Sequence, residues 1–154
     1  MSSENRKIIA ENRKAYYDFF IIEKFEAGLV LTGTEIKSIR MGRVTMADCF
    51  ARVEKGEVLL YNMHISPYVH GNRYNHDPVR TRNVLLHKQE IMKLFGKTQE
   101  KGLSLIGLKL YWSGDWAKIE LGLAKGKKEY DKRDTIKQRD SNREIGRAMR
   151  KFAE

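Results

Sequence analysis

The sequence has a single cysteine, two prolines and no long apolar run, and these shortages exclude several kinds of protein. One cysteine, Cys49, cannot form an intramolecular disulfide or a multi-cysteine metal site. No stretch approaches the roughly 20 apolar residues that a membrane-spanning helix requires. The polar, basic amino terminus also lacks the hydrophobic segment of a signal peptide. These features predict a cytoplasmic protein with no membrane partner.

The patterns of catalytic and metal-binding sites are also absent. The histidines, at positions 64, 70, 76 and 87, lack metal-ligand spacing, and there is no GxSxG nucleophile elbow. The stretch GLAKGKK at 122–128 has three residues between its glycines and no Ser or Thr after the lysine, so it is not a phosphate loop. Glu26 and Glu35 could meet in space as paired carboxylates, but a helix cap already explains Glu35. We predict no enzyme, no metal and no cofactor.

Positive charge is in excess. The net charge is +10 and the isoelectric point is about 9.7, which suits a polyanionic partner, with nucleic acid favoured over a membrane surface. Residues 126–154 hold ten Lys or Arg and six Asp or Glu (10 − 6 = +4), which leaves +6 for the rest of the chain. We predict a tail that is disordered when free and helical when bound. A solvated surface helix or a solubility tail is the alternative.

Strand patterns dominate the rest of the chain, so the fold class is mainly β. We expect a flexible basic lead-in at 1–15, a body at 16–125 and the tail at 126–154. Aromatic and β-branched composition predicts a strand at 17–25, and apolar patterns predict strands at 49–53, 58–65, 103–112 and 116–123. A capping box at Thr32 and Glu35 predicts a helix ending at Gly42, and helical spacing predicts another from 86 to 95, closing at Gly96. A small antiparallel barrel with two or three short helices fits this order, and a small sandwich is the alternative.

The long segment 66–83 has no regular apolar period and points to nucleic acid. It carries Arg80 and Arg82 beside Pro78, together with several aromatic side chains. Arginine forks suit phosphate oxygens, and aromatic faces stack on unpaired bases. Combined with the basic tail, this segment predicts RNA or DNA binding.

Several ordered blocks of sequence give the chain a close resemblance to one family. The blocks are ENRKA at 11–15, FEAGL at 25–29, GTEIKSIR at 33–40, DPVRTR at 77–82, KGLSLIGLKLYW at 101–112 and GLAKGKKEYDKR at 122–133. From residue 11 to about residue 139 the chain resembles the SsrA-binding protein family, also called small protein B. The tail beyond this point matches in character more than in sequence.

The resemblance implies an oligonucleotide-binding (OB) type barrel whose carboxyl tail is unstructured when free. It also implies a non-catalytic adaptor for transfer-messenger RNA (tmRNA). Such an adaptor holds the tRNA-like domain of tmRNA and, with elongation factor Tu and GTP, delivers it to stalled ribosomes for trans-translation. The body takes the place of a tRNA anticodon arm, while the tail enters the decoding centre of 16S rRNA and the mRNA channel.

The resemblance also implies where RNA is bound. In the body it points to Glu26, Leu85 and Lys118, and the wider expected set adds Lys14, Tyr17, Arg80, Arg82 and His87. Glu26 has a structural salt bridge as its alternative role, and Leu85 has core packing. In the tail we expect ribosome contacts from basic residues, one aromatic ring and a thin apolar stripe, namely Lys127, Lys128, Tyr130, Asp131, Lys132, Arg133, Lys137, Arg139, Arg143, Ile145, Arg147 and Met149.

Two other functions fit the barrel and the charge. A constitutive ribosome-associated or initiation-factor-like protein would copurify with ribosomes that are not stalled. An RNA-processing enzyme would cleave RNA with a metal ion, which the missing ligand clusters disfavour. We expect this protein to be a monomer.

Overall fold

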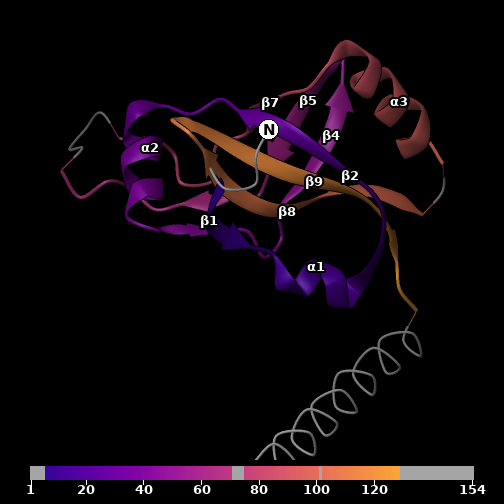
Figure 1. Ribbon diagram of the computed structural model, residues 1–154, viewed down its shortest axis with the longest axis horizontal. Coiled ribbons are helices and arrows are strands. Elements are labelled where there is room, and N and C mark those ends of the chain that lie inside the picture. The colour runs from indigo at the N-terminus through magenta and orange to yellow at the C-terminus, as the bar shows by residue number, and fades with distance from the viewer. Residues whose placement is uncertain (1–5, 71–74, 101, 129–154) are drawn as a thin grey trace, which may run out of the picture.

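The computed structural model describes residues 6–70, 75–100 and 102–128. Strands form the centre of the molecule, with α2 and α3 at opposite ends and α1 beneath it (Figure 1). The elements follow in the order β1 (Arg6–Glu11), α1 (Arg13–Asp18), β2 (Phe19–Leu29), α2 (Gly33–Arg40), β3 (Val44–Thr45), β4 (Phe50–Glu54), β5 (Glu57–Tyr61), β6 (His64–Ile65), β7 (Arg82–Leu85), α3 (Lys88–Thr98), β8 (Leu103–Ser113) and β9 (Trp116–Gly126).

The main sheet closes on itself. Its seven strands follow the order β1-β8-β4-β5-β7-β2-β9, and β9 also pairs with β8, so the strands from β8 to β9 form a ring. The strand pairs are antiparallel, with long registers between β2 and β9 and between β8 and β9. Strand β1 is not part of this ring and pairs with β8 alone. The predicted antiparallel barrel is therefore confirmed, and the alternative of a sandwich is wrong.

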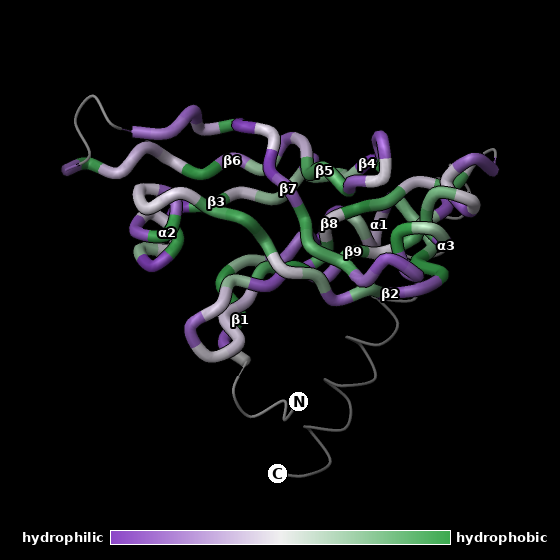
Figure 2. The backbone as a smooth tube through the Cα atoms, turned by 90° about the horizontal axis from the view of Figure 1, so that it is seen from above, coloured by the Kyte–Doolittle hydropathy of each residue, from purple (hydrophilic) through white to green (hydrophobic). Residues whose placement is uncertain are grey.

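Alternate residues of the barrel strands fill one interior. Leu60, Leu110, Ile119 and Leu121 of the strands are completely buried, and so is Leu94 of the helix α3, which belongs to the same cluster. Hydrophobic residues lie mainly along the strands, while the ends of the loops are hydrophilic (Figure 2). Because a strand sends successive side chains to opposite faces, the same alternation fixes which residues lie on the outside.

The predicted capping box is present. The backbone N–H of Thr32 donates to the Glu35 carboxylate at 2.8 Å, and α2 begins at Gly33. Of the described helices, none is long and apolar enough to cross a membrane. The prediction for the 86–95 helix was wrong at both ends, because α3 begins at Lys88 and continues past Gly96 to Thr98. Gly96 lies on the exposed side of α3, where a glycine costs only about 1 kcal/mol, so it does not end the helix.

Strands β4 and β5 form a hairpin around Lys55 and Gly56, which both have positive φ (50° and 78°). A two-residue turn of this kind matches the twist of the flanking strands. The expected strand 58–65 is interrupted, because Asn62 also has positive φ, at 61°. The chain then continues as the short strand β6, which pairs with β3 instead.

Residues 6–15 are not a flexible lead-in, so that expectation was wrong for this segment. Arg6–Glu11 pairs with β8, and Arg13–Asp18 is helical. Asn12 joins the two elements: its side-chain oxygen accepts from the Ala15 N–H at 3.3 Å, and its amide nitrogen donates to the Gly107 carbonyl at 2.9 Å. The contact with β8, distant in sequence, orders this polar stretch. It also means that Tyr17 lies in α1, because β2 starts only at Phe19.

Candidate nucleic-acid interface

Three of the residues expected to bind RNA lie together on the outer face of the barrel. Strand β2 lies between β7 and β9, and its Gly28 is registered with Leu85 on one side and with Lys118 on the other. Glu26 precedes Gly28 by two residues and therefore shares its face, while Ala27 between them is buried. The fold thus brings Glu26, Leu85 and Lys118 together from three strands. We call these three residues the central row.

Leu85 is available to a partner. Its side chain is 63% exposed, whereas Val84 just before it is buried. The alternative of core packing for Leu85 is therefore wrong. An apolar side chain held on a rigid strand can pack against a base or a sugar.

Glu26 and Lys118 form an ion pair within the central row. The Lys118 ammonium nitrogen lies 3.5 Å from a carboxylate oxygen of Glu26, and each side chain is 28% exposed. The structural salt bridge considered for Glu26 therefore exists. The same contact orients the lysine, so a structural role and an RNA-binding role for Glu26 are compatible.

A second ion pair continues the charged strip along the same face. The Lys24 ammonium lies 3.6 Å from Glu120, and it also lies 5.6 Å from the centre of the Tyr16 ring. The interaction with Tyr16, followed by the attraction of Glu120, raises the pKa of Lys24, although partial burial opposes this shift. Glu120 is registered opposite Glu26, so the two Lys–Glu pairs lie side by side. The face therefore presents balanced charges in fixed positions.

His87 lies two residues beyond Leu85, exposed at the start of α3. Its backbone N–H donates to the Glu90 carboxylate at 3.2 Å. This bond fixes the start of α3. His87 is therefore held at a fixed position two residues after Leu85 of the central row. The position agrees with the expected RNA contact of His87, which stays a prediction.

Arg82 does not reach the surface, so its expected contact with RNA was wrong. The side chain is completely buried, and its guanidinium is paired with the buried carboxylate of Glu35. It also donates to the carbonyls of Met63 at 2.6 Å and Pro78 at 3.2 Å. Burial lowers the pKa of Arg82, and Glu35 opposes that shift. Arginine stays a cation at neutral pH even so. The residue holds α2, the segment between β5 and β6, and the loop before β7 together.

Arg80 shares the same carboxylate but remains partly exposed. Its guanidinium donates to Glu35 at 2.7 Å and to the Val30 carbonyl at 3.3 Å, and 35% of the side chain is exposed. Burial raises the pKa of Glu35, but the hydrogen bonds from Arg80 and from Thr32 outweigh burial and hold this pKa below its ordinary value. Glu35 therefore has basic partners of its own and is not half of a carboxylate pair with Glu26.

Lys14 and Tyr17 lie on α1, away from the central row. The Lys14 ammonium lies 3.4 Å from Asp48 in an exposed ion pair, and Tyr17 is half-buried. The expected RNA contacts of Lys14 and Tyr17 stay predictions.

The beginning of the tail is attached to α1. The Lys127 N–H donates to the Asp18 carbonyl at 2.8 Å, and the Lys127 ammonium donates to the Tyr16 carbonyl at 3.0 Å. The same ammonium lies 5.0 Å from the centre of the Phe20 ring. Lys128 is exposed. The expected tail contacts from Tyr130 to Met149 lie outside the described residues.

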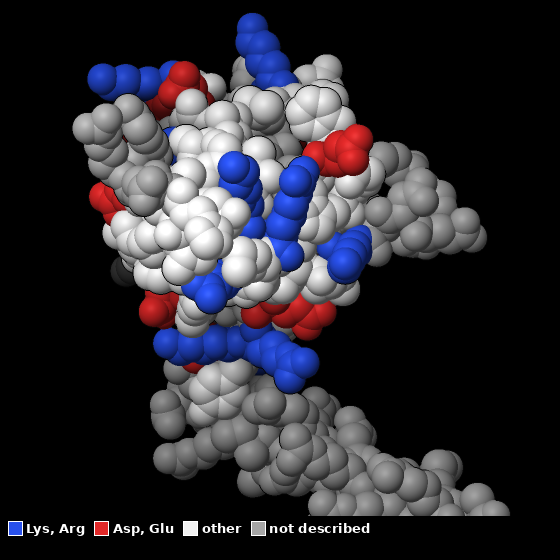
Figure 3. All heavy atoms as spheres, turned by 90° about the vertical axis from the view of Figure 1, so that its left-hand side faces the viewer, with Lys and Arg blue, Asp and Glu red and all other residues white. Residues whose placement is uncertain are grey.

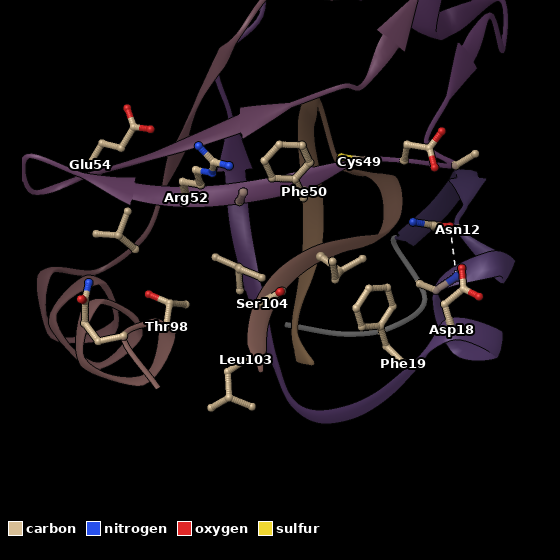
Figure 4. A pocket seen from close by; sticks show the side chains of 18 residues that line it. Asn12, Asp18, Phe19, Cys49, Phe50, Arg52, Glu54, Thr98, Leu103 and Ser104 are labelled. Carbon is tan, nitrogen blue, oxygen red and sulfur yellow. Dashed lines mark hydrogen bonds between the residues drawn. The ribbon is translucent and has the colours of Figure 1, made fainter. Parts of the chain in front are cut away.

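A hollow of about 540 Å³ lies elsewhere, between α1, β4 and the start of β8. Phe19, Phe50 and Leu103 contribute apolar surface to it, and Arg52 and Glu54 lie along β4 (Figure 4). Asp18 and Asp48 also line this hollow. Three carboxylates against one guanidinium would repel a phosphate backbone. This hollow is therefore a poor nucleic-acid site. Cys49 in its wall is buried, and burial raises the pKa of its thiol to about 12.

Basic side chains gather on the side of the molecule that carries α2, with carboxylates toward the edge of this view (Figure 3). Lys37, Arg40 and Arg43 are exposed there. Within the described ranges, none of the three forms an ion pair with a carboxylate. The Lys37 ammonium lies 5.3 Å from the centre of the Tyr68 ring. Among the described residues, no group of three or more His, Cys, Asp or Glu side chains could hold a metal ion.

Sequence reasoning missed Lys24, Glu120 and the buried role of Glu35. The period-two alternation of β2 and β9 was a usable signal for the first two, because it assigns them to the outer face. The sequence did not predict that β7, β2 and β9 are neighbours in the sheet, because these strands are far apart in the chain.

Comparison with known proteins gives one consistent result. A family model described as "SmpB protein" matches residues 9–151. The SsrA-binding protein of Carboxydothermus hydrogenoformans is 67% identical over 144 residues, covering 94% of this chain and 97% of the relative. That of Bacillus subtilis is 58% identical over 150 residues, covering 97% and 96%. A solved chain from "tmRNA-SmpB: a journey to the center of the bacterial ribosome" superposes with a TM-score of 0.65 at 49% identity, covering 78% of this chain and 85% of that one.

Proposed function

The chain belongs to the SmpB family, and on this premise we propose that its central row binds the tRNA-like domain of tmRNA for delivery to stalled ribosomes. The observation that carries this proposal is the convergence of Glu26, Leu85 and Lys118 on one exposed face. The function is that of a binding adaptor in trans-translation.

Each side chain of the central row has a distinct role in this proposal. The Lys118 ammonium binds a phosphate oxygen, and Leu85 packs against a base or ribose. A carboxylate would repel phosphate, so Glu26 accepts a hydrogen bond from a 2′-hydroxyl or a base amine while it orients Lys118. The arrangement suits an RNA with a particular shape. Such an RNA must present a phosphate to Lys118 and a hydrogen-bond donor to Glu26 at the same time.

The remaining parts of the function follow from the family. The body stands in place of a tRNA anticodon arm, and the tail enters the decoding centre and the empty mRNA channel. Elongation factor Tu with GTP joins through the RNA. The protein acts in the cytoplasm as a monomer and catalyses nothing, so purified protein leaves bound RNA intact.

The test is a titration of the full chain against tmRNA, with elongator tRNA as competitor, at two salt concentrations. Binding that survives moderate salt and the competitor supports shape-specific recognition. Equal affinity for both RNAs, lost as salt rises, would reduce the function to nonspecific charge. Equal binding to ribosomes that are not stalled would favour a constitutive ribosomal protein.

Single substitutions test whether the central row makes the contact with tmRNA. We expect Lys118→Met to weaken tmRNA binding roughly 10-fold or more, the scale of one charged hydrogen bond. Lys93→Met is the matched control, since Lys93 forms an exposed pair with Glu23 at 2.8 Å outside the central row. If Glu26 acts only by orienting the lysine, Glu26→Gln has no further effect in a Lys118→Met background. An effect that persists there identifies Glu26 as an RNA contact in its own right.

A further inference from the structure

Trp116 is the first residue of β9, and 75% of its side chain is exposed. Along β9 the side chains of Ala117 and Ile119 are buried, while Trp116 and Lys118 alternate with them. The indole therefore projects from the same outer face as the Lys118 ammonium. At about 3.4 Å per residue, the two side chains start about 7 Å apart.

Val30 follows the end of β2, and like Trp116 it is an exposed apolar residue. The β2–β9 register ends with Gly28 opposite Lys118, and Val30 lies two residues beyond Gly28. The Val30 N–H donates to the Asn83 carbonyl at 3.1 Å, which continues the contact with β7 beyond the last registered pair. Val30 is 43% exposed. Trp116 and Val30 are thus exposed apolar residues two positions from Lys118 and Gly28, respectively.

The backbone holds Trp116 in place. Trp116 is registered with Ser113 across a two-residue turn, where Gly114 has φ 60°. An isolated exposed hydrophobic residue needs no explanation. An exposed indole on a rigid hairpin, one step from a lysine and on the same face as an exposed leucine, has the composition of a base-stacking platform.

We propose that Trp116 stacks on an unpaired base of the bound RNA while Lys118 holds a neighbouring phosphate. This inference rests on the proposed function and adds the kind of RNA element that the face recognises. A base inside a duplex has no free face for an indole, so the ligand is an unstacked loop nucleotide and not a helical stem.

The first experiment follows indole fluorescence during titration with tmRNA. The chain has two tryptophans, so Trp112→Phe leaves Trp116 as the single reporter. Stacking on a base quenches this emission, and an equal amount of fully duplex RNA leaves it unchanged. Emission that does not change while tmRNA is bound would overturn the proposal.

The second experiment measures affinity. Trp116→Ala should weaken tmRNA binding about 5- to 150-fold, the range found for removing one stacking aromatic, and Trp116→Phe should recover most of it. Phe95→Ala is the control, because Phe95 is 54% exposed on α3, outside this face. A wild-type affinity for Trp116→Ala would overturn the stacking role alone. Failure of the wild-type chain to prefer tmRNA over elongator tRNA would overturn the proposed function instead.

Discussion

Replacing Arg82 with methionine separates a structural arginine from an RNA-binding one. Methionine keeps much of the aliphatic length but removes the guanidinium. The buried Glu35 carboxylate then keeps only Arg80 as a cationic partner. The carbonyls of Met63 and Pro78 also lose their donor.

The size of the effect follows from burial. Removing one partner of a buried ion pair typically costs about 3–5 kcal/mol, because the other charge is left without compensation. Arg80 limits the loss here, whereas the two unpaired carbonyls add to it. We therefore expect Arg82→Met to lower the free energy of unfolding by about 3–5 kcal/mol, out of the roughly 5–15 kcal/mol of a typical domain. A surface arginine used for RNA would change stability by only about 0.5 kcal/mol.

Urea unfolding followed by circular dichroism measures this change in the free energy of unfolding. With a slope near 2 kcal/mol per molar urea, the midpoint should fall by about 1.5–2.5 M. Arg80→Met is the matched control, because it contacts the same carboxylate from a partly exposed position and should have a smaller effect. An unchanged midpoint for Arg82→Met, combined with lost tmRNA affinity, would refute the structural assignment.

Three further predictions test other parts of the molecule. Because the pKa of Glu35 is held below its ordinary 4.5, its stabilising contribution is complete above that value and is lost as the pH falls through the folded-state pKa. Urea midpoints measured from pH 7 down to about 3 should therefore fall less steeply for Glu35→Gln, and parallel curves would contradict this. A Cβ at Gly107 would lie 2.7 Å from the Cys49 sulfur, so Gly107→Ala should cost about 1–3 kcal/mol, and Cys49→Ala in the same chain should recover part of it; no recovery would place the strain elsewhere. Deleting residues 132–154 should preserve tmRNA binding in a gel-shift titration but abolish tagging in a reconstituted assay, and full tagging would refute a separate role for the tail.

Much of the barrel was predictable because local patterns agree with the final structure. The turn at Lys55 and Gly56 and the capping box at Thr32 and Glu35 depend only on neighbouring residues. Strand β1 was not predictable in this way. It becomes a strand by pairing with β8, about one hundred residues later.

The candidate site was harder to predict from local sequence patterns than the barrel. Alternation along β7 places Arg82 on the inner side with Val84, but an arginine is rarely found in a core unless it is paired. Its partner, Glu35, lies 47 residues away and was already explained as a helix cap. Convergence of Glu26, Leu85 and Lys118 likewise needs the order of three strands, which residue patterns alone do not provide.

The distribution of charge divides the binding into two parts with different responses to salt. On the outer face, Lys24 and Lys118 each carry a carboxylate partner, so few counterions are released when this face meets RNA. The tail has ten basic residues, and Lys37, Arg40 and Arg43 have no acidic partner among the described residues. Each phosphate neutralised contributes about −0.7 to −0.9 to the slope of log affinity against log salt. Recognition of tmRNA by the body should therefore have a shallow slope, equivalent to one or two phosphates, whereas engagement of the ribosome through the tail should have a steep one. A steep slope for tmRNA binding by the chain lacking residues 132–154 would mean that unpaired cations, and not the central row, carry the affinity.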